Sequence, residues 1–292
     1  MIFPNCHANG KVIRIYDFGN DSALKRNIDI WLPDDYPAAE HYNVLYMHDG
    51  QMLFDSADTW NHQEWMLDET ASSLIKEGFM KPVIIVGIWN GGSSRHADYF
   101  PQKPFEILDD SVRKALYEAR RPEENSVFQK HRIRSDTYLE FIVKELMPYI
   151  DSNFSTIQDR NSTFIGGSSM GGLISWYAAC EYPEVFGGAI CMSTHWPGIF
   201  LIEKNPIPDA FIDYLKNNLP QANKTKFYFD RGTVGLDAFY EPFQKSVDSL
   251  FISKGYDEEN FMSRDFKGAD HNEKAWSERL SIPLLFMMGS EK

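Results

Sequence analysis

The residues best suited to chemistry in this sequence form the pentapeptide GSSMG at positions 167–171. This is the G-x-S-x-G spacing, in which a strained turn between a strand and a helix exposes the central serine and the flanking glycines keep the turn uncrowded. Residues 163–165 have the apolar, partly β-branched character of a strand end, and the residues from Leu173 have helical spacing up to Pro183. An ordinary glycine-rich turn would have the same letters, but the strand before it and the helix after it favour Ser169 as a nucleophile.

A serine hydroxyl needs a neighbouring base, oriented by a third group, to attack a carbonyl at neutral pH. With this turn, the partners follow in the chain order serine, acid, histidine. The two histidines after Ser169 are His195 and His271. His271 lies in a loop after the last expected strand, at the sheet edge where open α/β sheets place their sites. His195 also follows a strand but is flanked by Trp196 and Pro197. The sequence therefore predicts His271 as the base, with His195 as the alternative.

The acid is expected after the preceding strand, KFYFDRG, where two aspartates are available. Asp230 lies within that strand, and the alternation of strand side chains can turn it toward a helix-covered face. Asp237 lies five residues beyond Gly232, in a loop long enough to reach back over the sheet edge. It also stands at the expected start of a helix, where an aspartate can serve only as a cap. We predict Asp237 as the acid and Asp230 as a structural hydrogen-bonding group.

Acyl transfer also requires N–H donors for the oxyanion of the tetrahedral intermediate. The residue after the nucleophile supplies one of them, here the Met170 N–H. The second comes from the loop after an earlier strand, and the sequence MHDGQ at positions 47–51 is such a loop. We assign the second donor to the Gln51 N–H, because Gly50 lets the backbone turn toward the site. A simple turn at Asp49-Gly50 is the alternative.

These residues must be positioned by an alternating series of strands and helices. The expected strands are 12–17, 26–33, 43–50, 81–89, 163–165, 188–196, 226–232 and 261–266. The expected helices are 60–76, 135–150, the segment after Ser169, 206–220, 237–254 and 273–286, the last interrupted by Pro283. This order predicts one α/β domain over residues 1–292. Its sheet is mostly parallel, it opens with an antiparallel hairpin, and helices cover both faces.

The long segment 91–134 follows a central strand and contains one charged helical stretch. It is either a lid-like insertion over the strand ends or a solvated surface excursion. Flat aromatic rings near such a site suit a sugar or phenolic group. We therefore predict substrate contacts from Trp60, Trp89 and Trp196.

Composition excludes several classes of function. The 292 residues have a net charge of −13 and no basic patch, which disfavours nucleic-acid binding. No apolar run approaches the length of a membrane span. The three cysteines are far apart and lack the spacing of a zinc site or a disulfide framework. The first residues lack the basic and apolar regions of a signal peptide, so we expect a cytoplasmic protein, with a removed leader and a periplasmic or secreted location as the alternative.

The chain resembles the putative-esterase family of α/β-hydrolases, which includes feruloyl and acetylxylan esterases (carbohydrate esterase family 1), siderophore esterases, S-formylglutathione hydrolase and mycolyltransferases. The matching segments span nearly the whole chain in family order: LYMHDGQ, VGIWN, RHADYFP, YLEFIVKELMPYI, GGSSMGG, YPEVFGGAICMS, DRGTVGLDAFYEPF and GADHNEKAW.

This resemblance implies an α/β-hydrolase fold and a Ser-Asp/Glu-His hydrolase without a metal or an organic cofactor. Its motif positions place the oxyanion donors at Gln51 and Met170. The expected activity is that of a serine carboxylic ester hydrolase on a small-molecule or oligosaccharide ester, including acetyl or feruloyl esters of carbohydrates. The alternatives are a thioester hydrolase, a siderophore esterase and an acyltransferase. A non-catalytic binding protein on the same fold would be expected to lack a triad member.

Overall fold

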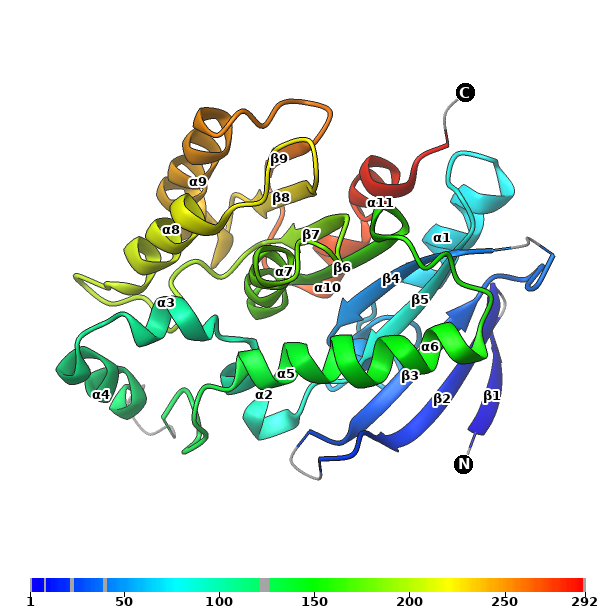
Figure 1. The fold of residues 1–292 in the computed structure, drawn as a ribbon, viewed down its shortest axis with the longest axis horizontal. Coiled ribbons are helices and arrows are strands. Elements are labelled where there is room, and N and C mark those ends of the chain that lie inside the picture. Colours follow the sequence, from blue (N-terminus) through cyan, green and yellow to red (C-terminus); the bar gives the residue numbers. More distant parts are fainter. Residues whose placement is uncertain (1, 8, 22–23, 39–40, 121–125, 291–292) are drawn as a thin grey trace.

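The computed structural model describes residues 2–7, 9–21, 24–38, 41–120 and 126–290 (Figure 1). Residues 22–23 of the expected hairpin turn and residues 121–125 of the insertion lie outside the described residues. In the described part of the chain, no helix is long and apolar enough to cross a membrane.

The centre of the molecule is a nine-stranded sheet with the strand order β1-β2-β3-β5-β4-β6-β7-β8-β9. The strands are β1 (Ile2–His7), β2 (Gly10–Phe18), β3 (Arg26–Leu32), β4 (Asn43–His48), β5 (Val83–Ile88), β6 (Thr163–Ser168), β7 (Gly188–Met192), β8 (Lys226–Gly232) and β9 (Phe261–Phe266). Strand β2 pairs antiparallel with β1 and β3, and β3 pairs antiparallel with β5, whereas strands β4 to β9 are parallel to one another. The predicted mostly parallel sheet with an antiparallel opening is confirmed.

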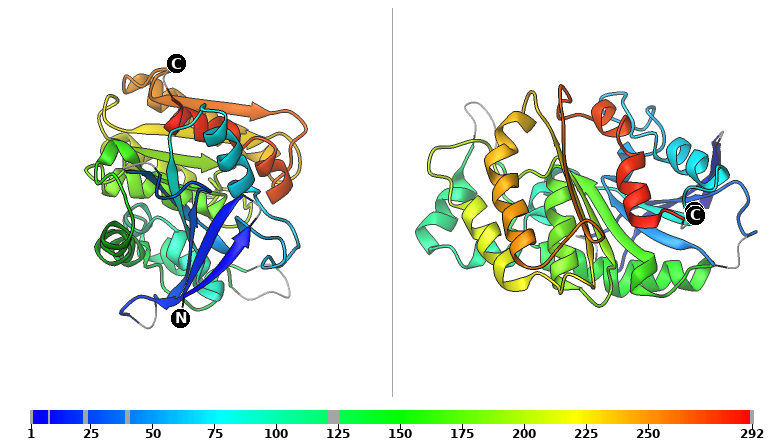
Figure 2. Two further views of the ribbon diagram at one scale, coloured as in Figure 1. Left: turned by 90° about the vertical axis from the view of Figure 1, so that its right-hand side faces the viewer. Right: turned by 90° about the horizontal axis from the view of Figure 1, so that it is seen from above.

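Helices cover both faces of this sheet (Figure 2). The helices are α1 (Leu67–Lys76), α2 (Arg95–Tyr99), α3 (Gln102–Glu106), α4 (Asp110–Glu118), α5 (Ser135–Phe141), α6 (Met147–Asn153), α7 (Met170–Glu181), α8 (Ile207–Asn218), α9 (Glu241–Ser253), α10 (Glu273–Ser277) and α11 (Ser281–Met288). Helices α1 and α11 lie on one face, and α5 to α9 lie on the other. A π-helical segment, Ile142–Leu146, joins α5 to α6 into one long helix.

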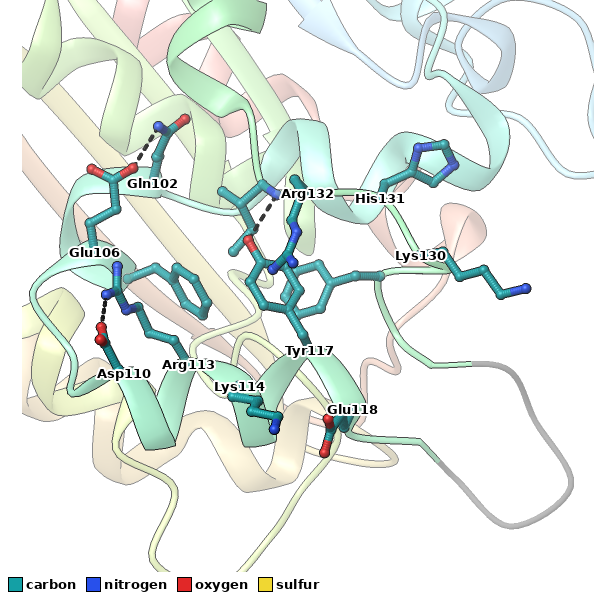
Figure 3. Close-up of a pocket in the computed structure, with 13 residues that line it drawn as sticks. Gln102, Glu106, Asp110, Arg113, Lys114, Tyr117, Glu118, Lys130, His131 and Arg132 are labelled. Atoms are coloured by element: carbon teal, nitrogen blue, oxygen red, sulfur yellow. Dashed lines mark hydrogen bonds and ion pairs between the residues drawn. The ribbon is translucent and has the colours of Figure 1, made fainter.

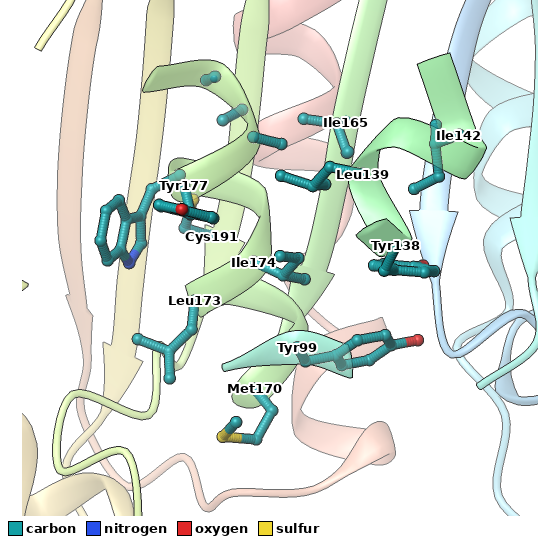
Figure 4. Close-up of a cluster of buried hydrophobic side chains, with 14 of the residues drawn as sticks. Tyr99, Tyr138, Leu139, Ile142, Ile165, Met170, Leu173, Ile174, Tyr177 and Cys191 are labelled. Atoms are coloured by element: carbon teal, nitrogen blue, oxygen red, sulfur yellow. The ribbon is translucent and has the colours of Figure 1, made fainter. Parts of the chain in front are cut away.

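Each face of the sheet has its own apolar core. On the α7 face, Ile165 of β6 packs among side chains of α5 and α7, including Leu139 and Ile174, and all three are fully buried (Figure 4). On the other face, Trp65 and Trp276 lie with their ring centroids 5.4 Å apart. Because both faces of the central strands are buried, these strands appear in the sequence as continuous apolar runs.

The structure corrects several boundaries. The helix expected over 60–76 begins at Leu67, because Met66 has a positive φ of 52° that ends helical geometry on its amino-terminal side. The segment expected as one helix over 273–286 is divided into α10 and α11, but the break lies at residues 278–280 and not at Pro283, which stands in the first turn of α11, where the missing N–H costs no hydrogen bond. The insertion contains α2, α3 and α4 where one charged helix was expected. Strand β1 was not predicted.

The parallel strands bring distant loops to one edge of the sheet. Asp49 follows β4, Asn90 follows β5, Ser169 follows β6, Asp237 follows β8 and His271 follows β9. The strand order reverses direction around β4, and such switch points are where open α/β sheets bind ligands.

Candidate active site

Ser169 occupies a strained turn between β6 and α7. Its backbone dihedrals, φ 57° and ψ −118°, lie in a region that residues with a side chain rarely occupy. A Cβ on Gly167 would lie 3.0 Å from the Cα of Gly171, so the turn leaves little room for a side chain there. The backbone N–H of Ser169 donates to the Met192 carbonyl at 2.9 Å, which ties the turn to β7. The geometry agrees with the steric reasoning for the G-x-S-x-G spacing.

The structure brings His271 and Asp237 together. Nδ1 of His271 lies 2.5 Å from Oδ1 of the fully buried Asp237. Oδ2 of Asp237 accepts hydrogen bonds from the Ser193 hydroxyl at 2.5 Å and from the Gly232 N–H at 2.6 Å. Burial alone raises the pKa of Asp237, but the hydrogen bond and charge of His271 and the other two donors hold that pKa below its usual value.

The ionised Asp237 fixes the tautomer of His271. A carboxylate can only accept hydrogen bonds, so Nδ1 of the imidazole must be the donor. In the neutral ring, Nε2 is then the nitrogen without a proton, as a general base requires. His271 and Ser169 line the same pocket.

Asp230 is engaged elsewhere. Both of its carboxylate oxygens accept hydrogen bonds from the Arg279 guanidinium, at 2.9 and 3.0 Å, and both residues are buried. Asp230 also accepts from the Tyr228 hydroxyl at 2.9 Å and from the Ser193 N–H at 3.0 Å. This arrangement matches the structural role expected for Asp230.

His195, the alternative base, has a partner on each ring nitrogen. Its Nε2 lies 2.7 Å from the Ile199 carbonyl, which can only accept, so Nε2 must donate. Its Nδ1 then accepts from the Tyr240 hydroxyl at 2.5 Å. Both nitrogens are therefore occupied in the folded protein, which argues against His195 as a base.

The two expected oxyanion donors stand in the first turns of two helices. Met170 is the first residue of α7, and Gln51 lies in the short 3₁₀ helix η1 (Gly50–Met52). The first N–H groups of such turns have no intrahelical acceptor. A Cβ on Gly50 would lie 2.4 Å from the backbone carbon of Gly87, so only glycine lets this turn approach β5 so closely.

A pocket of about 390 Å³ lies over these groups. Besides Ser169 and His271, the side chains that line it are mostly amides, charged groups and indoles: Asp49, Gln51, Met52, Trp60, Asn61, Trp65, Asn90, Arg95, Ser168, Asn272, Glu273 and Trp276. Trp60 is 82% exposed at its rim. The side chain of Asn61 donates to Glu273 at 2.9 Å.

The other two tryptophans expected at the substrate do not line this pocket. The Trp89 indole N–H donates to Asp29 at 2.8 Å, and the guanidinium of Arg14 lies 4.6 Å from its ring centroid. Trp196 is 1% exposed and donates to Gln244 at 2.9 Å within the core. The Trp89 ring thus lies against the ion pair of Arg14 and Asp29, and the Trp196 ring packs in the core, in contrast to the prediction.

The insertion contributes Arg95 to the site pocket, while residues within the segments 102–118 and 128–133 border a separate pocket of about 610 Å³. Figure 3 shows polar side chains of this second pocket paired with one another, Gln102 with Glu106 and Arg113 with Asp110. The larger cavity therefore contains none of the predicted catalytic residues.

Sequence reasoning missed four polar residues around the site. Asp49 and Arg95 form an ion pair in the pocket wall. Ser193 donates hydrogen bonds to both Asp230 and Asp237, and Arg279 forms an ion pair with Asp230. Asp49 and Arg95 both lie in segments that carry the family resemblance, LYMHDGQ and RHADYFP, which is the signal that could have singled them out.

In the described residues, no group of three or more His, Cys, Asp or Glu side chains is arranged to hold a metal ion.

The model of one protein family, described as "Putative esterase", matches residues 22–286. The chain belongs to this family. Two proteins of Bacillus subtilis (strain 168) are similar in sequence: the uncharacterized protein YbbA is 38% identical over 166 residues, 56% of this chain and 55% of YbbA. The uncharacterized protein YjcH is 22% identical over 188 residues, 64% of this chain and 63% of YjcH. The matches thus span less than two thirds of either relative.

Solved structures show the same fold. An IroE-like serine hydrolase from Shewanella oneidensis has a TM-score of 0.66 at 18% identity, covering 94% of this chain and 79% of that one. A ferulic acid esterase has a TM-score of 0.66 at 18% identity, covering 96% and 98%. The enterobactin esterase from Shigella flexneri has a TM-score of 0.63 at 16% identity, covering 97% and 60%. The α/β-hydrolase fold is confirmed.

Proposed function

We propose that this chain is a serine carboxylic ester hydrolase that works through Ser169, His271 and Asp237 and forms an acyl-enzyme. The observation that carries the proposal is the presence in one pocket of a serine on a strained turn and a histidine bonded to a buried carboxylate. Membership of an esterase family supports the same reaction type.

The reaction follows from these positions. The Ser169 hydroxyl attacks the ester carbonyl while Nε2 of His271 takes its proton, and Asp237 stabilises the imidazolium that forms. The N–H groups of Met170 and Gln51 bind the oxyanion. The imidazolium then protonates the leaving alcohol, and water releases the acyl group by the same route.

The side chains lining the pocket support a carbohydrate ester, such as an acetyl or feruloyl ester, as the substrate. The amide of Asn61 and the carboxylate of Glu273 are suited to hydrogen bonds with the neutral hydroxyl groups of a sugar. The exposed indole of Trp60 offers a flat face on which a sugar or phenolic ring can pack.

The first test is Ser169→Ala, measured on p-nitrophenyl acyl esters. The change should lower kcat by about 10⁶, because the members of a triad act as a unit. A fluorophosphonate should label Ser169. Ser168→Ala is the matched control, since Ser168 lines the same pocket and should remain dispensable for labelling. Full activity in Ser169→Ala, or labelling at Ser168, would contradict the proposal.

The second test compares substrates on one preparation: acetylated xylo-oligosaccharides, methyl ferulate, a siderophore trilactone and S-formylglutathione. The highest kcat/KM on a carbohydrate or feruloyl ester supports the proposed class. A preference for the thioester or the trilactone identifies a thioester hydrolase or a siderophore esterase, and transfer of the acyl group to an added alcohol identifies an acyltransferase. Absence of both turnover and labelling leaves a binding protein.

A further inference from the structure

The loop with the expected oxyanion donor Gln51 begins at an unusual residue. Asp49 has a left-handed backbone, φ 57° and ψ 44°, although it is not a glycine. Such a conformation costs free energy and persists where surrounding contacts hold it. Asp49 is also 8% exposed, so its carboxylate is largely removed from water.

Arg95 and Asn90 hold this carboxylate. Nε of Arg95 donates to Oδ1 and its terminal nitrogen to Oδ2, each at 2.7 Å, in the two-point geometry that suits a guanidinium. The side chain of Asn90 donates to Oδ1 at 2.7 Å. Burial by itself raises the pKa of Asp49, but Arg95 and Asn90 keep that pKa below its usual value, so the group is a carboxylate.

The same residues hold the backbone of the loop. The N–H of Asn90 donates to Oε1 of Gln51 at 3.2 Å, and the N–H of Asp49 donates to the Tyr99 hydroxyl at 3.2 Å. The guanidinium of Arg95 lies 5.3 Å from the centroid of the Tyr99 ring. Residues after β5 thus fix both the side chain of Asp49 and the turn that presents the Gln51 N–H.

The charge of Asp49 also lies close to where negative charge develops in the reaction. A Cβ built on Gly171, in the first turn of α7, would lie 3.6 Å from Oδ2 of Asp49. The N–H groups of that turn are the expected partners of the oxyanion, and an unpaired carboxylate beside them would repel it. The positive charge of Arg95 cancels this repulsion.

We propose that Arg95 is a positioning residue for the oxyanion site, which holds the Asp49–Gln51 turn in its strained conformation and neutralises the Asp49 carboxylate beside the nucleophile. This inference rests on the proposed function. It predicts an effect on the transition state, where the oxyanion exists, and little effect on binding of the neutral ester.

The test is Arg95→Met, assayed with a p-nitrophenyl ester. Removal of one oxyanion donor lowers kcat by roughly 10²–10³, so loosening the turn should lower kcat by roughly 10–100-fold, with KM changed by about twofold or less. Arg134→Met is the matched control: Arg134 also pairs with a buried aspartate of this region, Asp98, at 2.6 Å, but lies outside the pocket. The control should lose comparable thermal stability and keep its kcat.

A second variant separates charge from structure. In the Arg95→Met background, Asp49→Asn removes the uncompensated carboxylate and should raise kcat several-fold above that of Arg95→Met alone. Arg95→Lys keeps the charge without the two-point contact, should fold like the native chain, and should give an intermediate kcat.

Native kcat in Arg95→Met, or an equal loss in Arg134→Met, would overturn the inference, as would a double variant no faster than Arg95→Met. The proposed function fails separately, if the unaltered chain neither hydrolyses the ester nor reacts with a fluorophosphonate at Ser169.

Discussion

Two buried carboxylates adjoin groups that line the pocket, but the partners of these carboxylates differ. In the loop after β8, Asp237 faces the imidazole of the pocket residue His271 at 2.5 Å. On the wall after β4, Asp49 faces the guanidinium of Arg95, with two contacts of 2.7 Å. The first partner is an imidazole, which can accept and release a proton, whereas the second is a guanidinium, which is always charged.

Because their partners differ, the two carboxylates have different electrostatic roles. The negative charge of Asp237 can stabilise an imidazolium that appears during the reaction, while the charge of Asp49 is cancelled at every stage. Asp230, like Asp49, is paired with an arginine: Arg279 lies 2.9 Å from Oδ1 of Asp230 but 4.0 Å from Oδ2 of Asp237. Of these three buried aspartates, Asp237 is the one whose partner can change its charge.

The largest expected effect comes from breaking the contact between Asp237 and His271. Asp237→Asn preserves the shape of the side chain but offers an amide where the imidazole needs a carboxylate. We expect kcat at neutral pH to fall by roughly 10⁴ with little change in KM, because the wrong tautomer and an unstabilised imidazolium impair proton transfer. Steady-state kinetics on a p-nitrophenyl ester measure both constants.

Asp230→Asn is the matched control on the same strand. It weakens a buried ion pair and leaves Arg279 partly unpaired, so the free energy of unfolding should fall by about 3 kcal/mol while kcat stays near the native value. Denaturant titrations of both variants provide the comparison. The reverse pattern, with a large loss of kcat in Asp230→Asn and native kcat in Asp237→Asn, would assign the acid to Asp230.

The sequence was most informative where local rules decide the structure. The turn at Ser169 depends on glycines two residues away, and its strand and helix are each visible in a short window. The choice of His271 needed only chain order and the rule that sites lie at strand ends. The fold class followed from the alternation of strands and helices.

The sequence was least informative where distant segments decide which way a side chain faces. Trp196 follows a strand near the site, yet it packs into the core beside Gln244, from a helix that begins 45 residues later. The pairing of Asp49 with Arg95 and of Asp230 with Arg279 joins residues 46 and 49 positions apart. No periodic pattern predicts such pairs, because each partner alone looks like an ordinary polar residue.

A smaller effect is expected at the open side of the pocket. Trp60→Ala removes an indole that is 82% exposed at the rim. Aromatic contacts contribute about 0.5–1.5 kcal/mol, so KM for a feruloyl or oligosaccharide ester should rise roughly 2–10-fold, with kcat nearly unchanged. KM for a p-nitrophenyl acetate should stay the same, since that substrate is too small to need the rim.

Tyr16→Ala, which removes an exposed aromatic ring on β2, is the control and should change neither KM. Equal increases in KM for large and small esters in Trp60→Ala would indicate a distorted pocket and would remove Trp60 from substrate recognition. This result would leave the roles of Asp237 and Asp49 unaffected, because Asp237 is buried beside His271 and Asp49 is held by Arg95, in contacts that do not include Trp60.

The smallest effect on activity is expected at a buried carboxylate that faces other acids. Asp68, in the first turn of α1, is 1% exposed, and burial together with the hydrogen bond and charge of Glu69 raises its pKa to about 8. The folded state therefore keeps the proton that the unfolded chain loses near pH 4, and stability falls as the pH rises from about 4 to about 8. Asp68→Asn removes this loss.

We expect Asp68→Asn to raise the free energy of unfolding at pH 8 by on the order of 2 kcal/mol, to change it little at pH 4, and to leave kcat unaltered. Urea titrations at the two pH values measure the difference. Asp213→Asn, on an exposed position of α8, should show no such dependence. Equal effects of Asp68→Asn at both pH values would mean that Asp68 is ionised in the folded protein. Burial without a positive partner would then not suffice to keep an aspartate protonated at this position.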